Sequence, residues 1–338
     1  MAIEKYEYEL RSLSEEIKAL VSASGKKIVK AINNEMVLIY WQIGKLIVQT
    51  EQNARADEQS TRNLIIDLSK ELSSHLGRGY SRSNLTYMRL FYIGYPAGVT
   101  ASHQLSWSHY IELLKVEGSL ERSFYENQSV AERWSVRELR RQKDSALFQR
   151  LSLSKDKDGI LKLSQKGQLY EREEDIIKDP YVLEFLNLPE ETRFSEKQLE
   201  NRILAKLQQF LLELGKGFAF VANQYRITLN NTHFYVDMAF YHRILKCFVL
   251  FDLKIREARQ HDVGQMNMYL NYFKEEENVK DDNPPIGIIL TTGKDEVMIE
   301  YATGGLSNKV FVSRYQTHLP DKDLLRARVS ELMRSSEQ

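Results

Sequence analysis

Cysteine is almost absent from this sequence, which has 338 residues and a single cysteine, Cys247. One thiol excludes an intrachain disulfide framework and a zinc site built from several thiolates. Cys247 lies in the apolar run LKCFVLF at residues 245–251, which is typical of a buried strand. We therefore interpret it as a small core residue in a reduced protein rather than as a nucleophile.

An excess of charge of either sign is also lacking, because 47 Lys and Arg residues balance 47 Asp and Glu residues. Any contact with nucleic acid must therefore come from local basic patches. No apolar run reaches the length of a membrane span, and the charged start, MAIEKYEYEL, has no secretory signal pattern. These absences predict a soluble cytoplasmic protein without membrane contacts.

The length of the chain and a change in its pattern predict two domains. Residues 1–155 show helical periodicity and few strand patterns, with a long apolar stripe over residues 26–51. Residues 156–178 are polar and include a charge run, so we predict a linker there. Residues 179–338 mix helical and strand periods and form the second predicted domain.

Within the first domain, the turn GRGYS at residues 77–81 separates two predicted helices, 62–76 and 84–93. Ser60 or Thr61 is expected to cap the first helix, and Ser83 the second. This pattern resembles a helix-turn-helix. The turn and the second helix carry basic and tyrosine side chains suited to phosphates and bases, namely Arg78, Tyr80, Arg82, Tyr87 and Arg89.

The second domain is predicted to be an α/β sandwich with a mixed central sheet. Its expected helices cover residues 196–214, 261–275 and 322–332. Its expected strands cover residues 218–222, 224–229, 234–240, 247–255, 286–290 and 309–313. Asn230 and Asn231 predict a hairpin turn between two of these strands.

Two of the predicted strands carry charged residues in apolar surroundings. Asp237 lies in FYVDMAF, and Asp252 and Lys254 lie in LFDLKI. Side chains alternate along a strand, so Asp252 and Lys254 should share a face. Burying such charges is costly unless they are paired or bind a metal. An Asp–Lys ion pair is the simpler interpretation, and a Mg²⁺ site held by Asp237, Asp252 and the Leu253 carbonyl is the functional one.

A metal bound there would activate water against a phosphodiester, with Lys254 orienting that water or offsetting the developing charge. The following helix carries Gln265 and Tyr269, four residues apart and hence on one face. Tyr269 alone would more often be a core residue. Its spacing from a glutamine, directly after the D-x-K strand, favours a catalytic role for both.

Taken together, these residues resemble the PD-(D/E)XK nuclease superfamily, in the branch whose helix carries Q-x-x-x-Y. More narrowly, nearly the whole chain resembles the bacterial YhcG-like family. Motifs in the first half are YWQIG at 40–44, LSKEL at 68–72, SNL at 83–85, MRLFY at 88–92, LSWSHY at 105–110 and WSVREL at 134–139. Motifs in the second half are DPY at 179–181, FLLELG at 210–215, GQM at 264–266 and PPIG at 284–287.

The resemblance implies a helical, winged-helix-like N-terminal domain and a restriction-endonuclease-like C-terminal domain. It also implies a further acid on the helix before the first strand, for which Glu200 is the expected residue and Glu196 a rival. Two positions depart from the family pattern. Asp252 stands where Glu is usual, and Gln224 lacks a preceding Arg, although Gln224 is still expected to contact nucleic acid.

We therefore expect a Mg²⁺- or Mn²⁺-dependent endonuclease acting on double-stranded DNA, and the resemblance suggests restriction or phage defence. A homodimer or higher oligomer is expected, since cutting both strands commonly needs two active sites. A second hypothesis is a non-catalytic DNA-binding or adaptor protein that keeps the nuclease fold as a scaffold. A third is a structural helical protein whose residues 26–51 bind partner chains.

Overall fold

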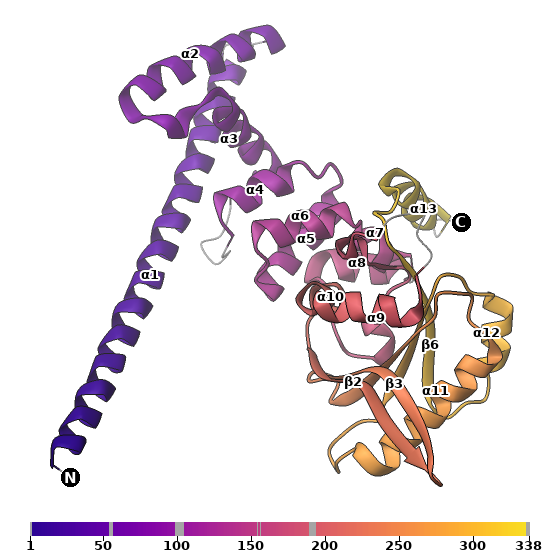
Figure 1. The fold of residues 1–338 in the computed structure, drawn as a ribbon. Coiled ribbons are helices and arrows are strands. Elements are labelled where there is room, and N and C mark those ends of the chain that lie inside the picture. Colours follow the sequence, from indigo (N-terminus) through magenta and orange to yellow (C-terminus); the bar gives the residue numbers. More distant parts are fainter. Residues whose placement is uncertain are drawn as a thin grey trace. The chain divides into compact units, whose positions relative to one another are not determined.

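The computed structural model describes residues 2–53, 57–98, 105–153, 155, 157–188 and 194–335 (Figure 1). The chain divides into two compact units, Met1–Arg140 and Arg141–Gln338. No helix within the described ranges combines the length and apolarity needed to cross a membrane.

The first unit is helical, as expected, and no strand occurs in its described ranges. Its elements are α1 (Ala2–Asn53), α2 (Glu58–Leu76), η1 (Arg78–Tyr80), α3 (Arg82–Gly94), α4 (Trp107–Leu114), α5 (Ser119–Glu132) and the start of α6 (Val136–Asp144). The predicted apolar stripe over residues 26–51 lies within the single long helix α1. The predicted caps are wrong, because Asp57 and Ser81 accept the hydrogen bonds from the first turns of α2 and α3.

Helices α1, α2 and α3 pack around a small core that includes Ile65, Leu85 and Met88. Gly44 permits a close approach of α1 to α3, since a Cβ atom there would lie 2.0 Å from the main-chain oxygen of Met88. This contact gives a physical reason for glycine in the YWQIG motif. The turn before α3 follows Gly77, whose φ of 88° favours glycine.

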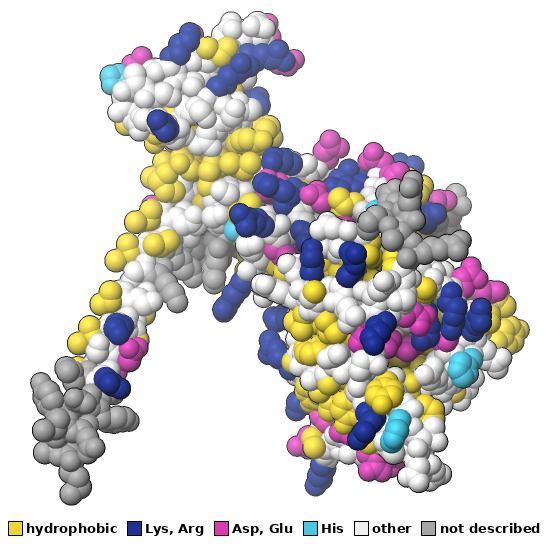
Figure 2. All heavy atoms as spheres, in the orientation of Figure 1, with side chains coloured by type: hydrophobic (Ala, Val, Ile, Leu, Met, Phe, Trp, Pro, Cys, Tyr) yellow, Lys and Arg dark blue, Asp and Glu magenta, His cyan; other side chains and the backbone are white. Residues whose placement is uncertain are grey.

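Part of α1 exposes apolar side chains along its length (Figure 2). The exposed residues are Leu13, Ile17, Leu20, Val21, Ile28, Val29, Ile32, Ile39 and Leu46. The predicted partner-binding surface over residues 26–51 includes several of them, and it stays a prediction.

The second unit contains the rest of α6, a six-stranded sheet and further helices. The remaining helices are α7 (Leu147–Ser152), α8 (Lys157–Lys166), η2 (Glu173–Ile176), η3 (Glu184–Leu186), α9 (Glu196–Ala205), α10 (Leu207–Leu214), α11 (Gln260–Tyr272) with a π-helical turn η4 (Phe273–Glu277), α12 (Glu296–Thr303) and α13 (Lys322–Ser335). The strands are β1 (Tyr181–Val182), β2 (Phe218–Leu229), β3 (Thr232–His242), β4 (Cys247–Leu253), β5 (Ile286–Thr291) and β6 (Lys309–Gln316).

The sheet has the order β1-β6-β5-β4-β3-β2 and is mixed, as predicted. Strands β2, β3 and β4 are antiparallel neighbours, whereas β4, β5, β6 and β1 run parallel. One apolar core joins one face of the sheet to α9 and α10, and a second core joins the other face to α11 and α12. These two cores place helices on both faces of the sheet, which is the arrangement of an α/β sandwich.

Several predicted boundaries differ from the structure. The helix expected over residues 196–214 breaks at Lys206 into α9 and α10, and the two strands expected over residues 218–229 are one strand with a bulge near Val221. The hairpin turn at Asn230 and Asn231 is confirmed, with positive φ at both. The predicted linker contains α8, so that segment is partly helical, and the predicted domain limits stay a prediction.

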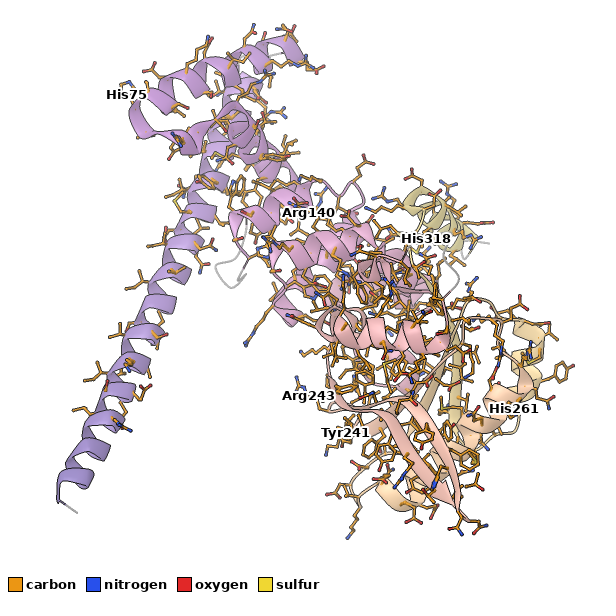
Figure 3. The ribbon with its side chains drawn as sticks, viewed as in Figure 1. His75, Arg140, Tyr241, Arg243, His261 and His318 are labelled. Carbon is orange, nitrogen blue, oxygen red and sulfur yellow. The ribbon has the colours of Figure 1, made fainter. Side chains whose placement is uncertain are left out.

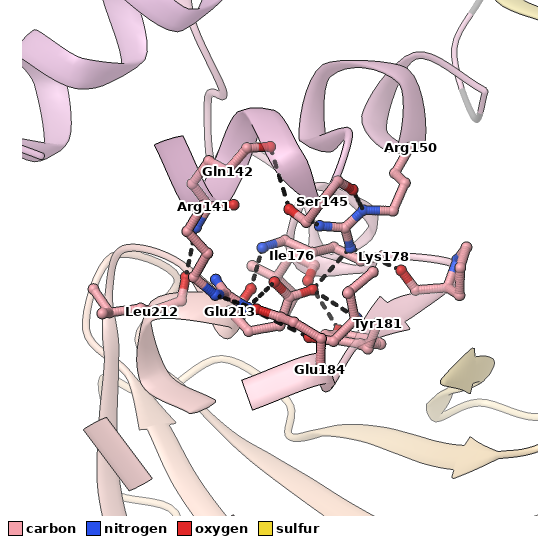
Figure 4. A network of polar contacts seen from close by, with 12 residues as sticks. Arg141, Gln142, Ser145, Arg150, Ile176, Lys178, Tyr181, Glu184, Leu212 and Glu213 are labelled. Atoms are coloured by element: carbon pink, nitrogen blue, oxygen red, sulfur yellow. Dashed lines mark hydrogen bonds and ion pairs between the residues drawn. The ribbon is translucent and has the colours of Figure 1, made fainter. Parts of the chain in front are cut away.

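A buried ionic network joins α6, α7, α10 and β1 (Figure 4). Glu213, fully buried on α10, accepts a bond of 2.8 Å from the guanidinium of Arg150, which is also buried. Its carboxylate further accepts bonds from Arg141 at 3.2 Å and from the Val182 amide at 3.0 Å. Lys178 donates to the Glu213 carbonyl. Burial opposes ionisation of Glu213, yet the three cations lower its pKa to about 2.

Replacing Glu213 with alanine would remove the carboxylate that Arg150 and Arg141 share and leave the Arg150 guanidinium buried without it, whereas Lys178 keeps the main-chain carbonyl as its acceptor. We expect the free energy of unfolding at neutral pH to fall by about 3–5 kcal/mol, measured by urea denaturation. The control is Glu174→Ala, which removes a half-exposed ion pair with Lys309 and should cost at most about 1 kcal/mol. Equal losses in the two variants would contradict a stabilising role for the network.

Candidate active site

Asp237 and Asp252 occupy neighbouring strands at the end of their shared ladder. The register pairs Met238 of β3 with Phe251 of β4, so the two aspartates follow directly where the strands part. The Leu253 amide donates a hydrogen bond of 2.7 Å to Asp237 Oδ2. The strand pattern that predicted a meeting of these two acids is therefore matched by the register.

Lys254 follows β4 and faces Asp252, as the alternation of side chains predicts. Its Nζ lies 2.6 Å from Asp252 Oδ2, as an ion pair without hydrogen-bond geometry, and both side chains are almost fully buried. Burial lowers the pKa of Lys254, but the Asp252 carboxylate outweighs burial and holds that pKa above its usual value. Lys254 is therefore an ammonium ion at neutral pH, which argues for a charge-stabilising role rather than that of a base.

Gln224 links the aspartates to the helix that precedes the sheet. Its side-chain amide donates to Glu200 Oε2 at 2.8 Å and to Asp237 Oδ1 at 3.1 Å. Gln224 has a φ of 48°, an uncommon conformation for a residue inside a strand, and this conformation gives its side chain the direction required to reach both acids. Gln224 was predicted to contact nucleic acid, whereas the structure places it among the carboxylates.

Both acids considered on α9 lie near this centre. Glu200 is buried and accepts a hydrogen bond from the Gln224 side-chain amide, which also donates to Asp237. Glu196 Oε1 accepts a bond of 3.4 Å from the Ile255 amide, one residue beyond Lys254. The helical spacing of four residues thus supplies one acid to each side of the site.

Gln265 and Tyr269 contact each other on α11, as their spacing predicts. The Gln265 amide donates to the Tyr269 hydroxyl, and that hydroxyl donates to the Tyr235 carbonyl at 3.1 Å. Tyr269 is 1% exposed, so it positions Gln265, which is half-buried, rather than reaching outward itself. Burial raises the pKa of Tyr269, and the charges of Asp252 and Asp237 add to that increase.

The electrostatics of the centre disfavour three adjacent carboxylate charges. Burial and then the neighbouring charge of Asp237 raise the pKa of Asp252, to about 7, although Lys254 opposes the shift. Burial is also the first cause of the raised pKa values of Glu200 and Asp237. Such clustered acids are typical of a site that holds a cation.

The donor set fits a hard divalent cation. Glu200 Oε1 is a buried oxygen without a hydrogen bond, and Asp252 Oδ2 is buried with only the Lys254 ion pair beside it. Carboxylate oxygens are the preferred ligands of Mg²⁺. In the part of the chain that the structure describes, no three His, Cys, Asp or Glu side chains already surround one point as a ligand set. Gln224 bridges Glu200 and Asp237, and Lys254 pairs with Asp252, so the acids lie beside one another.

Sequence reasoning missed a supporting pair beside Lys254. Both terminal nitrogens of Arg256 contact the Asp262 carboxylate, at 2.7 and 2.8 Å. Asp262 is buried and also accepts the Arg259 amide at the start of α11. This pair attaches the end of β4 to the helix that carries Gln265. The signal in the sequence was an acid three residues after Arg259, at a helix N-terminus.

The residues predicted to contact nucleic acid in the first unit divide into two groups. Arg78 and Arg82 are exposed in and after the turn of the helix-turn-helix. Arg89 instead contacts both carboxylate oxygens of Glu51, at 2.8 Å each, and joins α3 to α1. Tyr80 and Tyr87 are half-buried, and Tyr80 packs against the helical core. A structural role therefore accounts best for Arg89 and Tyr80.

The chain matches two family models. One, described as the YhcG PDDEXK nuclease domain, matches residues 174–330, and the other, described as the DUF1016 N-terminal domain, matches residues 16–150. The chain is also 36% identical to a protein of Escherichia coli (strain K12) named "Putative nuclease YhcG", covering 94% of this chain and 92% of that protein.

Among solved structures, the chain is similar to a repair endonuclease from Pyrococcus abyssi, with 19% identity and a TM-score of 0.28. That alignment covers 38% of this chain and 50% of the endonuclease. EndoMS in its apo form aligns with 17% identity and a TM-score of 0.26, covering 39% of this chain and 49% of that one. The chain thus spans about half the length of these structures.

The raised pKa of Asp252 predicts that metal affinity depends on pH. Because this pKa lies above the unfolded value of 3.8, the folded protein retains a proton from about pH 4 to about pH 7. The proton on Asp252 therefore stabilises the folded, metal-free protein at low pH, and this stabilisation is lost as the pH rises through that range. Metal binding requires the carboxylate, so millimolar Mg²⁺ should raise the melting temperature more at about pH 8 than at about pH 6.

Differential scanning fluorimetry with and without Mg²⁺ measures this difference. Asp252→Asn should remove it, whereas Asp295→Asn, at the exposed cap of α12, should retain it. A Mg²⁺ shift that is the same at both pH values in the unaltered chain would refute the assignment.

The side-chain amide of Gln224, and not its backbone conformation, should determine how tightly the site binds a metal ion. Gln224→Gly relieves the strained φ and keeps the protein at least as stable, but frees Glu200 and Asp237 from each other. We expect affinity for Mg²⁺ or Mn²⁺ to fall by about tenfold or more, as for other residues that orient metal ligands, measured by titration calorimetry. Asn231→Gly, also at positive φ but in the hairpin turn, is the matched control and should bind normally.

Proposed function

The chain belongs to the YhcG family of PD-(D/E)XK nucleases, and from that premise we propose that it is a metal-dependent endonuclease that cuts double-stranded DNA. The observation that supports this most is the group formed by Asp237, Asp252, Glu200 and Lys254. It combines buried carboxylate oxygens without hydrogen bonds with a buried ammonium ion, at the end of two strands.

Each residue has a distinct proposed role. Asp237, Asp252 and the Leu253 carbonyl would hold Mg²⁺ or Mn²⁺, which when bound supplies a Lewis acid for the phosphate and a more acidic water. The Lys254 ammonium ion offsets the negative charge that grows on the phosphate oxygens in the transition state. Glu200, with a raised pKa and a free Oε1, accepts a hydrogen bond from the attacking water.

Gln224 and Gln265 position these groups. Gln224 fixes Glu200 relative to Asp237, and Gln265, oriented by Tyr269, is available to a phosphate oxygen of the substrate. The helix-turn-helix of the first unit supplies Arg78 and Arg82 for contacts with the DNA backbone. Tyr87 remains a candidate for the same surface. Two copies acting together would cut both strands, and removal of foreign DNA is the biological role we propose.

A non-catalytic DNA-binding role is the alternative, and the Lys254–Asp252 ion pair favours it, because that pair occupies one oxygen of a proposed metal ligand. In that case the centre would be a stable ionic cluster rather than a site for hydrolysis. The two functions differ in whether bound DNA is cut.

Supercoiled plasmid incubated with Mg²⁺ or Mn²⁺ distinguishes them. We expect nicking or linearisation, reduced at least about 100-fold by Asp237→Asn, Asp252→Asn or Lys254→Met, and unchanged by the exposed control Lys309→Met. Absence of cleavage by the unaltered protein, together with salt-sensitive DNA binding in a gel shift, would support the scaffold.

A further inference from the structure

A cleft lies on the same edge of the sheet as the aspartates. It has a volume of about 660 Å³ and is lined by polar and apolar side chains from the end of β6, the residues before β1 and the start of α13. Because β4, β5, β6 and β1 are parallel, their carboxyl ends share one edge. Asp252 is next to last in β4, so the cleft and the catalytic centre open toward the same side.

The distance between the two sites is short. One strand, β5, separates β4 from β6, and the register aligns Leu253 with Leu290 and Leu290 with Ser313. Two steps between strands amount to about 10 Å. Duplex DNA rises about 3.4 Å per nucleotide along its axis. Successive phosphates of one strand lie further apart than this rise, so the distance corresponds to at most about three nucleotides.

The cleft is lined by two arginines, Arg314 and Arg328, and two aspartates, Asp179 and Asp321, whose partners differ. Asp179 is shared by two cations, with Lys294 Nζ at 2.6 Å and Arg314 Nε at 3.1 Å. Arg328 is exposed on α13, and no ion pair to it occurs within the described ranges. The second acid, Asp321, accepts two amide hydrogen bonds from the first turn of α13. The cleft therefore retains a positive group, Arg328, without an acidic partner.

A buried polar atom in the lining also lacks a partner. The side-chain nitrogen of Gln316 is buried without a hydrogen bond, on the face of β6 that also carries Arg314. Tyr315 between them points to the opposite face and packs in the apolar core. Buried polar atoms are rarely left unsatisfied, so such an atom beside a cleft indicates a ligand. His318 is exposed in the loop between β6 and α13 (Figure 3), and Phe194 precedes α9. Both add flat rings on which a base can stack.

We infer that this cleft binds one nucleotide of the substrate strand within about three positions of the phosphate that is cut, with its phosphate on Arg314 and Arg328. The inference rests on the proposed nuclease function, since it places the cleft on the path of the same strand. The Gln316 side-chain nitrogen then gains a partner on the bound nucleotide. The role of the cleft is to fix where along the strand the cut falls.

The test uses the full chain carrying Asp252→Asn, with a fluorescent DNA duplex and binding measured by anisotropy at several salt concentrations. Loss of one phosphate contact should lower the slope of log affinity against log salt by about one. Between about 50 mM and about 200 mM salt, the drop in affinity should then be about three- to fourfold smaller for the chain that also carries Arg328→Ala than for the chain with Asp252→Asn alone. Arg334→Ala, at an exposed position of the same helix outside the cleft, should leave the slope unchanged.

A cleavage assay with the active chain gives a second, separate result. Arg328→Ala should raise KM and leave kcat unchanged on a long duplex, and should have no effect on a duplex too short to reach the cleft. An unchanged salt slope for Arg328→Ala, with a reduced slope for Arg78→Ala as the positive control, would overturn the inference. Absence of cleavage by the active chain would overturn only the proposed function, because the binding assay does not need catalysis. Equal competition by free inorganic phosphate and by DNA would identify a phosphate site that is independent of the strand.

Discussion

The fold of the second unit buries several carboxylates close together, and the rest of its structure must compensate for their charges. Like charges in a medium of low polarity repel strongly, so each such group must be protonated, paired or bound to a cation. The protein meets this constraint twice, with opposite outcomes. Glu213 is surrounded by three cations and its pKa falls to about 2, whereas Asp252 has one cation and a neighbouring acid and its pKa rises to about 7.

This difference distinguishes a carboxylate whose charge is fully compensated from one whose charge is not. Around Glu213, the carboxylate oxygens are occupied by Arg150, Arg141 and the Val182 amide, and a further cation would have no ligand there. Around Asp252, positive charge is in deficit and buried oxygens remain without hydrogen bonds. Buried charge alone is therefore a poor indicator of a site, and the balance between acids and their donors is a better one.

Sequence patterns predicted which side chains meet at the centre better than they predicted the residues that support it. Alternation along β4 placed Lys254 beside Asp252, and helical spacing joined Gln265 to Tyr269, because both rules depend only on local geometry. The bridge made by Gln224 could not be predicted, since it requires a positive φ that the sequence gives no reason to expect at a glutamine. Arg89 was assigned to DNA because its partner, Glu51, lies 38 positions away, beyond the range of any local pattern.

The location of the centre follows from the topology of the sheet. Strand β4 is antiparallel to β3 and parallel to β5, and its ladder with β3 ends at Met238 and Phe251. Beyond that pair, the Leu253 amide bonds to the Asp237 side chain instead of to a strand carbonyl. The strands part at this point, and the two carboxylates follow directly after the last paired residues. The change of strand direction at β4 thus fixes where the proposed site lies, at the carboxyl edge of the parallel strands, where sheets of this kind bind their ligands.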